Sequence, residues 1–135
     1  MERVYTTPRL DKLGIRPGSR VALVGRLDEA DPSFAAELAD RTADVTHGDP
    51  APETDVVLLA ADSTAELAPE RLRSLARRIK RNGAIWVVSR KGKAATIRDV
   101  EVIACALAAD LVDNKVASFS ATHTALRLVT PVRLR

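Results

Sequence analysis

Nearly continuous apolar runs alternate along this chain with segments whose apolar residues recur at helical spacing. Three runs are the strongest: "RVALVG" (residues 20–25), "DVVLLAA" (55–61) and "AIWVVS" (84–89). Such runs are typical of strands that are covered on both faces of a sheet. A weaker run, "ADVTHG" (43–48), predicts a further strand.

Helices are predicted on either side of the first strand. The segment before it predicts a short helix around Leu10 to Leu13, closed by Gly14. The segment after it, "DPSFAAELADR" (31–41), predicts a second helix. Asp31 can cap the free N–H groups of that helix, and Pro32 suits its first position.

Two further helices are predicted in the second half of the chain. "PERLRSLARRIKRNG" (69–83) has the clearest helical periodicity, and Asn82-Gly83 would end it by supplying a left-handed residue. "TIRDVEVIACALAADL" (96–111) predicts the last helix. The apolar stripe expected to face the core consists of Val100, Ile103, Leu107 and Leu111.

The tail has two β-rich runs around a short polar link, Ser120 to Thr124, with no helix between them. Strands alternating with helices indicate a parallel α/β sheet, and this tail adds an antiparallel hairpin. We therefore predict a single three-layer Rossmann-like domain over residues 1–135 with methyltransferase-like topology. The last strand should insert beside "AIWVVS" and leave the preceding strand at the edge.

Composition excludes several classes of protein. Hydrophobic residues make up 46% of the chain and aromatic residues only 3%, so the core must be aliphatic. No apolar run approaches the ~20 residues that span a bilayer, and the N-terminus lacks the apolar region of a secretory signal. The single cysteine, Cys105, excludes an internal disulfide and a multi-cysteine zinc site. A cytoplasmic location without membrane contact is the expectation.

The formal net charge of +3 conceals an uneven distribution. Residues 1–62 carry seven Lys/Arg and twelve Asp/Glu, whereas residues 63–135 carry fourteen and six. Residues 71–98 contain ten basic residues and no acidic one. This asymmetry points to an anionic small molecule, a nucleic acid or an acidic protein as the class of partner.

The loop after the first strand does not predict a cofactor site. A methyltransferase or dinucleotide enzyme needs glycines there, so that the backbone can approach the ligand. This loop has only Gly25, and Asp28, Glu29 and Asp31 follow it. A solvated acidic loop is the interpretation, and neither S-adenosylmethionine nor NAD is expected to bind.

A basic loop after "AIWVVS" is the main candidate site. Ligands of open α/β sheets bind at the carboxyl ends of the strands, where the segment "SRKGK" (89–93) should lie. The candidate anion-binding residues are Arg90, Lys91 and Lys93, with Lys115 as a neighbour. The cations on the preceding helix should lie at the other end of that strand and need not join this site.

The other candidate residues are expected to line the crevice or to belong to no site. The candidate crevice-lining residues are Gly25, His47, Asp62, Ser89, Asp113 and Asn114. His47 and His123 are weak candidates for acid–base chemistry, and no residue is predicted to be catalytic. No spacing of His, Cys and Asp predicts a metal site. Cys105 is expected to be a small, half-buried filler.

The segments "TPRLDKLGIRPGSRVALVG", "DVVLLAA", "NGAIWVVSRKGK" and "LVDNKVASFS" follow one another in this order. Together they resemble a family of small bacterial proteins known only as a domain of unknown function. The resemblance implies a compact Rossmann-like domain and no particular activity. Related tails have an acidic residue and Trp where this chain has "SATHTALR", with His123 near the Trp position. The strand "NGAIWVVS" is also similar to the fifth-strand region of S-adenosylmethionine-dependent methyltransferases.

Three functions remain open from the sequence. The first is a non-catalytic or degenerate Rossmann-like binding module with a basic anion-binding loop. The second is a methyltransferase with an atypical cofactor loop. The third is a nucleic-acid accessory protein that works through basic residues 71–98. Strong salt dependence of nucleic-acid binding would favour the third function.

Overall fold

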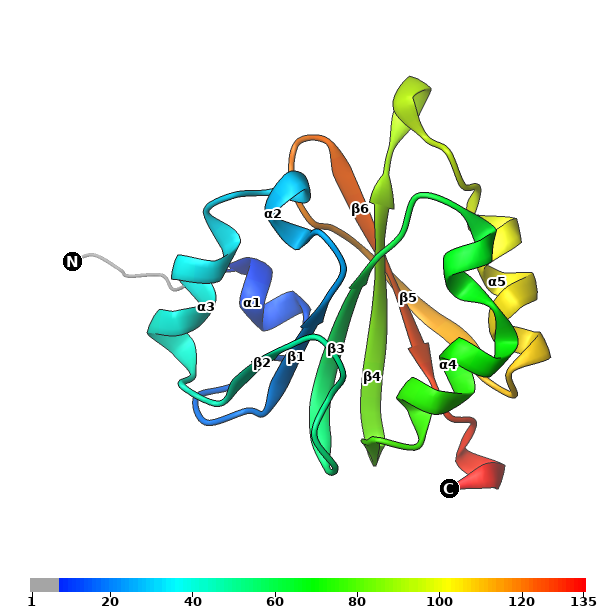
Figure 1. Ribbon diagram of the computed structural model, residues 1–135, viewed down its shortest axis with the longest axis horizontal. Coiled ribbons are helices and arrows are strands. Elements are labelled where there is room, and N and C mark those ends of the chain that lie inside the picture. Colours follow the sequence, from blue (N-terminus) through cyan, green and yellow to red (C-terminus); the bar gives the residue numbers. More distant parts are fainter. Residues whose placement is uncertain (1–7) are drawn as a thin grey trace.

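A six-stranded mixed sheet forms the centre of the protein, with helices on both of its faces (Figure 1). The computed structural model describes residues 8–135. The strands are β1 (Val21–Val24), β2 (Val45–His47), β3 (Thr54–Ala60), β4 (Ile79–Arg90), β5 (Val112–Ser118) and β6 (His123–Val129). The α-helices are α1 (Pro8–Lys12), α2 (Leu27–Ala30), α3 (Phe34–Arg41), α4 (Pro69–Ala76) and α5 (Asp99–Ala108). No helix in the described part of the chain is long and apolar enough to cross a membrane.

The sheet confirms the predicted topology. Its strand order is β2-β1-β3-β4-β6-β5. β1 pairs in parallel with β2 and β3, and β3 pairs in parallel with β4. β6 pairs antiparallel with both β4 and β5, so the last strand does insert beside β4 and β5 becomes the edge.

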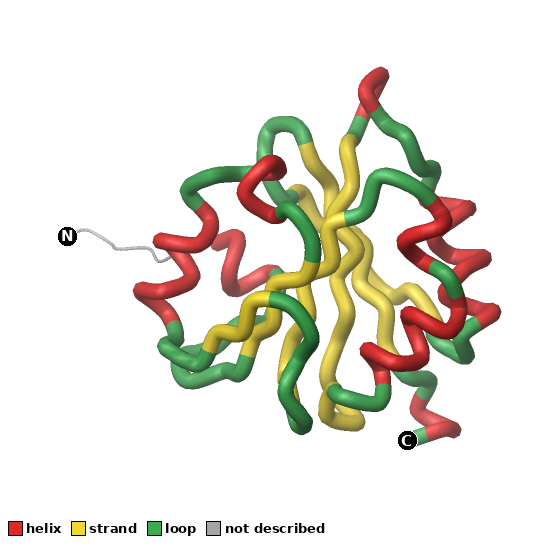
Figure 2. The backbone as a smooth tube through the Cα atoms, viewed as in Figure 1, coloured by secondary structure: helices red, strands yellow, loops and turns green. Residues whose placement is uncertain are grey.

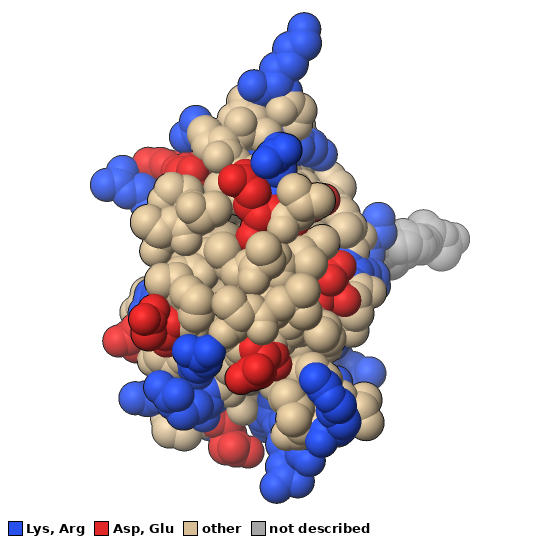
Figure 3. Space-filling model, turned by 90° about the vertical axis from the view of Figure 1, so that its right-hand side faces the viewer, with Lys and Arg blue, Asp and Glu red and all other residues tan. Residues whose placement is uncertain are grey.

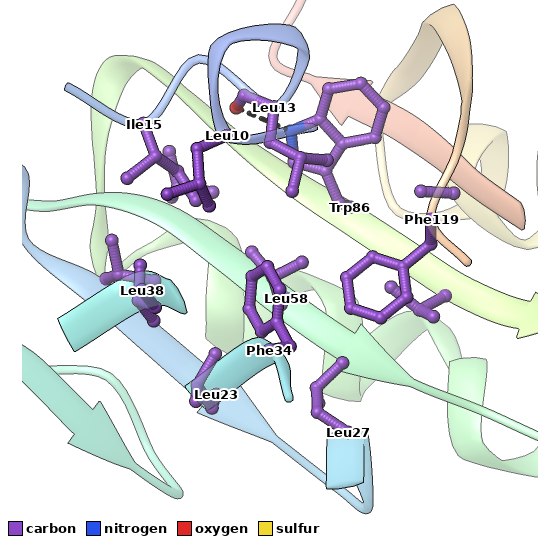
Figure 4. Close-up of a cluster of buried hydrophobic side chains, with 14 of the residues drawn as sticks. Leu10, Leu13, Ile15, Leu23, Leu27, Phe34, Leu38, Leu58, Trp86 and Phe119 are labelled. Atoms are coloured by element: carbon purple, nitrogen blue, oxygen red, sulfur yellow. Dashed lines mark hydrogen bonds between the residues drawn. The ribbon is translucent and has the colours of Figure 1, made fainter. Parts of the chain in front are cut away.

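Two apolar layers hold the helices to the sheet. α1, α2 and α3 cover one face, and α4 and α5 cover the other (Figure 2). Trp86 of β4 is fully buried under α1, where its Nε1 donates a hydrogen bond to the Leu13 carbonyl at 3.1 Å (Figure 4). Because this bond satisfies the indole N–H, Trp86 can fill the core of a chain that has few other aromatic residues.

The boundary between α4 and β4 differs from the prediction. α4 ends at Ala76 and β4 already begins at Ile79, so Asn82-Gly83 lies inside a strand. The register of β4 against β3 shifts here, from Thr54–Ile79 to Val56–Ala84. Gly83 is not left-handed; a Cβ on it would lie 2.9 Å from the Asp55 carbonyl oxygen. The glycine therefore permits close approach of two backbones, and the helix-ending role was wrong.

The predicted apolar stripe of α5 is confirmed only in part, since Ile103 packs against the core and Leu111, just after the helix, is buried. Val102 and Ala106 face the sheet, whereas Val100 and Leu107 are 62% and 59% exposed. The helix is apolar on both sides, so periodicity alone could not distinguish its inner face from its outer face. Cys105 is half-buried and packs at the edge of this layer, in agreement with a filler role.

The segment between β1 and α3 is more ordered than a solvated loop. Residues 27–30 form α2, in which Leu27 and Ala30 are buried. α3 begins at Phe34, later than predicted, with Ser33 as its N-cap residue. Asp31 instead holds the preceding turn, because its Oδ1 accepts hydrogen bonds from the Ser33 N–H at 2.9 Å and hydroxyl at 2.7 Å.

Candidate functional site

A cavity of about 310 Å³ opens at the carboxyl ends of β1, β3 and β4, beside the start of β6. This is the end of an open α/β sheet at which ligands bind. Its lining residues are Gly25, Arg26, Glu29, Ala60, Ala61, Asp62, Glu66, Val88, Arg90 and His123. Two of the predicted crevice residues, Gly25 and Asp62, are therefore part of it, together with Arg90 from the predicted anion loop.

Arg90 and His123 meet at the rim of this cavity. They are directly opposite each other in the antiparallel pair of β4 and β6. The Arg90 guanidinium lies 3.5 Å from the carboxylate of Asp62, and both side chains are about half exposed. An exposed pair at this distance is worth little energetically, so Arg90 remains available to a second anion.

His123 is held close to these charges in a partly buried position. Its Nδ1 lies 2.8 Å from the Thr122 hydroxyl oxygen. Burial lowers the pKa of His123 below 6.5, and the positive charge of Arg90 lowers it further. The imidazole is consequently neutral at pH 7 and becomes a second cation only on acidification or beside a bound anion.

The remaining cations of the loop extend beyond the cavity. The Lys91 N–H donates to the Thr122 carbonyl at 3.0 Å, and Lys91 Nζ donates to the Ser118 hydroxyl at 3.0 Å. Gly92 takes a left-handed conformation with φ 68° and starts a 3₁₀ turn with Lys93. Neither lysine has a carboxylate partner among residues 8–135, so both can contact an external anion.

The glycine after β1 has a packing role. Gly25 has φ 84°, and a Cβ on it would lie 2.8 Å from the Ala60 carbonyl oxygen. β1 and β3 approach so closely here that only glycine fits. Leu27 and Ala30 then fold inward at the end of β1, where a glycine-rich loop would otherwise expose backbone to a ligand.

The cavity wall carries acids as well as cations. Glu29 pairs with Arg26 at 2.8 Å. Glu66 accepts hydrogen bonds from the backbone N–H groups of Asp62 at 2.8 Å and Ser63 at 3.1 Å. Both carboxylates therefore make contacts within the loops that follow β1 and β3. Glu29 and Glu66 are thus already engaged by protein donors, whereas the Arg90 side chain at the end of β4 has, in the described part of the chain, only its 3.5 Å contact with Asp62.

Three predicted site residues lie elsewhere. Asp113, Asn114 and Lys115 are on the edge strand β5, whose beginning adjoins the opposite end of β4. Lys115 is paired with Arg127, and its Nζ donates to the Lys12 carbonyl at 3.3 Å. Placing these residues beside the basic loop was wrong, because β5 runs parallel to β4 and reaches the loop only at its last residue. Ser118 is the neighbour that Lys91 contacts.

His47 and Ser89 also lie outside the 310 Å³ cavity. His47 ends β2 and lines a smaller cavity of about 180 Å³, which it shares with Gly25 and Leu27. Ser89 is 4% exposed, within the sheet. Its neighbours Val88 and Arg90 line the cavity, and alternation along a strand directs Ser89 to the other face.

The sequence did not predict that His123 and Ser118 would join the loop. Both flank the turn between β5 and β6, and only the register of the hairpin against β4 brings them to Arg90 and Lys91. A usable signal was present, since an inserted antiparallel strand must begin where β4 ends. The polar link after Ser118 therefore has to lie near Arg90.

The long basic tract divides into two groups at opposite ends of β4, as the sequence predicted. Arg77, Arg78 and Arg81 lie around the start of β4, whereas Arg90 and Lys93 lie at its end. Figure 3 shows this on the side that carries α4 and α5, where most Lys and Arg side chains gather toward the two ends. Within residues 8–135, no group of three or more His, Cys, Asp and Glu side chains could hold a metal ion.

The solved structures to which this chain is similar include methyltransferases. A putative methyltransferase from Thermoplasma acidophilum matches with a TM-score of 0.59 and 11% identity, over 95% of this chain and 76% of that one. The N-methyltransferase NodS from Bradyrhizobium japonicum matches with a TM-score of 0.61 and 12% identity, over 92% and 93%. At such identities the likeness establishes the fold alone.

A longer enzyme matches through one part of its chain. It is an O-methyltransferase from neocarzinostatin biosynthesis, solved with S-adenosyl-L-homocysteine and 1,4-dihydroxy-2-naphthoic acid. The TM-score is 0.60 at 15% identity, and the match covers 91% of this chain but 52% of that one. No curated protein matches the sequence. A family profile matches residues 10–132, and the chain thus belongs to DUF3052, a family of proteins of unknown function.

Proposed function

We propose that this protein is a non-catalytic, methyltransferase-like domain that binds an anionic group at the rim of its carboxyl-end cavity. The binding surface consists of Arg90, Lys91, Lys93 and His123. The observation that carries the proposal is the pairing of Arg90 with His123, which puts a cation and a neutral imidazole side by side at the cavity mouth.

The loop supplies donors of different kinds to such a ligand. Arg90 can present a planar guanidinium at the cavity, and Lys91, whose Nζ contacts the Ser118 hydroxyl, can present an ammonium just beyond it. Each exposed ion pair contributes at most ~1 kcal/mol, so binding depends on several donors acting together. His123 adds a further charge once the bound anion raises its pKa.

The segment after β1 supports a role without a nucleotide cofactor. Gly25 is explained by its contact with Ala60, and the buried Leu27 and Ala30 leave no glycine-rich backbone facing the cavity. The lining acids Glu29 and Glu66 already hold arginine or backbone groups. A ligand at the rim needs none of these residues to move.

Titration with inorganic phosphate and with a short phosphorylated oligonucleotide tests the proposal. Backbone amide shifts should move at residues 90–93 and 123 in the wild type, and much less in the triple variant Arg90→Ala, Lys91→Ala and Lys93→Ala. The matched control replaces Arg77, Arg81 and Arg133, three exposed cations elsewhere, by Ala. Equal binding of inorganic phosphate by the loop variant and the control variant would refute the proposal.

The same titration separates the nucleic-acid function from a small-anion function. A nucleic-acid partner should bind more tightly as the oligonucleotide lengthens, with affinity falling steeply as salt increases. A small-anion site should respond to phosphate alone and show no gain with length. The basic residues around the start of β4 should matter only for the first of these outcomes.

S-adenosylmethionine binding is the second candidate function. It is favoured by the fold, since the O-methyltransferase neighbour was solved with S-adenosyl-L-homocysteine, and by the acids that line the cavity, which suit a cationic sulfonium. Calorimetry at about 100 μM cofactor should give no saturable heat if the rim proposal is right. A stoichiometric isotherm would instead establish a cofactor site.

A further inference from the structure

A second large cavity lies at the opposite end of the sheet, on the face that carries α1. Its volume is also about 310 Å³. It is lined by residues from the α1–β1 loop, the starts of β3 and β4, and the middle of β6. These residues are Leu13, Gly14, Arg16, Ser19, Asp55, Val56, Asn82, Gly83, Ala84 and Arg127. None of them belongs to the anion-binding surface proposed above.

Arg127 is the central feature of this cavity. It is half-buried in the register position between Trp86 and Lys115. Its guanidinium donates one hydrogen bond, from Nη1 to the Asn114 side-chain oxygen at 3.3 Å. No carboxylate pairs with it among residues 8–135. A guanidinium has five N–H donors, so most of them lack an acceptor within residues 8–135.

The charge on Arg127 is not compensated by its surroundings. Burial lowers its pKa below the ordinary value, and the positive charge of Arg135 lowers it further. Arginine nevertheless stays protonated under all physiological conditions. The protein therefore keeps a partly desolvated cation close to another cation, which an anion from solution would stabilise.

Other donors converge on the same space. The exposed Arg16 side chain has no acidic partner in the described structure. The Ser19 hydroxyl oxygen accepts the Arg16 N–H at 2.9 Å, which leaves its own proton free to donate. Asn82 is exposed at the rim.

The one acid in the lining, Asp55, is already neutralised. Its Oδ1 pairs with Lys80 at 2.9 Å, and its Oδ2 accepts the Arg20 N–H at 2.8 Å. The local balance of the cavity is therefore positive.

We propose that this cavity binds a small molecule through its carboxylate or phosphate oxygens, with Arg127 as the principal ligand-binding residue and Arg16 as the second. Arginine presents paired donors that match two oxygens of such a group. The site is separate from the loop at residues 90–93, and each can be present without the other.

Titrations with inorganic phosphate and with succinate, at constant ionic strength, test this inference and distinguish the two oxygen sources. Backbone amides of Gly14, Ser19 and Gly83 should shift with at least one probe. Arg127→Gln should weaken that binding by about tenfold or more, as expected for loss of a charge-assisted hydrogen bond. Arg77→Gln, the same change on an exposed arginine of the other face, should bind like the wild type.

The melting temperature provides a second readout, which distinguishes a ligand-binding arginine from one that only stabilises the fold. Without an anion, Arg127→Gln should melt at or above the wild-type temperature, because the change removes an uncompensated charge. The better probe should raise the melting temperature of the wild type but not that of the variant. A clear loss of stability in Arg127→Gln, or shifts confined to residues 90–93, would overturn the second site.

Discussion

Arg90 and His123 lie opposite each other where β4 and β6 pair, so the last strand of the chain brings an imidazole to the end of the central strand. Burial and the charge of Arg90 both lower the pKa of His123. The unfolded chain takes up this proton first as the pH falls through 6.5, so the folded state loses stability on acidification.

His123→Gln should therefore lose less stability than the wild type between about pH 7 and pH 5. Urea unfolding followed at several pH values measures the difference. Arg90→Gln should raise the pKa of His123, which can be read from the imidazole resonances. Identical pH profiles in the wild type and His123→Gln would mean that the folded protein does not disfavour the charged imidazole.

Arg9 links α1, through hydrogen bonds and ion pairs, to the segments that follow β1 and β5. Its guanidinium bonds to Asp31 at 2.7 Å, to Glu37, and to the Phe119 carbonyl at 2.7 Å, and it lies over the Phe34 and Phe119 rings. Arg9→Met should lower the free energy of unfolding by about 2–3 kcal/mol, because two partly buried carboxylates lose their partner. Arg41→Met, in which an arginine of α3 is replaced, is a comparison that leaves this cluster intact.

Arg9→Met should also change how the free energy of unfolding depends on pH in the acid range. Hydrogen bonds from Ser33, followed by that from Arg9, lower the pKa of Asp31 from 3.8 to about 2. A carboxyl with a lowered pKa stabilises the fold above its ordinary value, and that contribution disappears as the pH falls toward about 2. Arg9→Met should consequently show a shallower loss of stability over that range, measured by acid titration of the circular dichroism signal.

Gly25 and Gly18 offer a matched test of the reason for glycine after β1. Both have φ 84°, but only Gly25 would bring a Cβ within 2.8 Å of a carbonyl oxygen. Replacing either glycine by alanine should lower the free energy of unfolding by about 1 kcal/mol, because alanine disfavours the left-handed conformation. Gly25→Ala should lose a further 1–3 kcal/mol, roughly, from the clash with Ala60. If denaturant unfolding showed equal losses of stability in the two variants, the packing explanation would be wrong, and close approach of a ligand would again be a reason for Gly25.

The sequence predicted the fold well because buried strands leave a strong local pattern. "RVALVG", "DVVLLAA" and "AIWVVS" each became a strand of the sheet, and the helix-free tail became the inserted hairpin. The position of the loop Arg90 to Lys93 at the end of the β4 strand could also be predicted from the sequence. The match to DUF3052 agrees with the resemblance noted in the same segments.

What the sequence could not supply was register. Lys115 and Ser118 are three residues apart on β5, and only the pairing through β6 decides which of them adjoins Lys91. The bulge near Asn82-Gly83 was missed for a similar reason, since it depends on the approach of Asp55 from β3. Both features arise from contacts between strands distant in sequence.

The last prediction concerns α5, whose two apolar faces the sequence could not distinguish. Val102 is 2% exposed against the sheet, whereas Leu107 is 59% exposed on the outer side. Val102→Ala should lower the free energy of unfolding by about 1–3 kcal/mol through lost burial and a small cavity. Leu107→Ala, although it removes more carbon atoms, should change it by about 0.5 kcal/mol or less. If urea unfolding gave the reverse order, the predicted stripe through Leu107 would be the buried one, and α5 would have to be rotated about its axis.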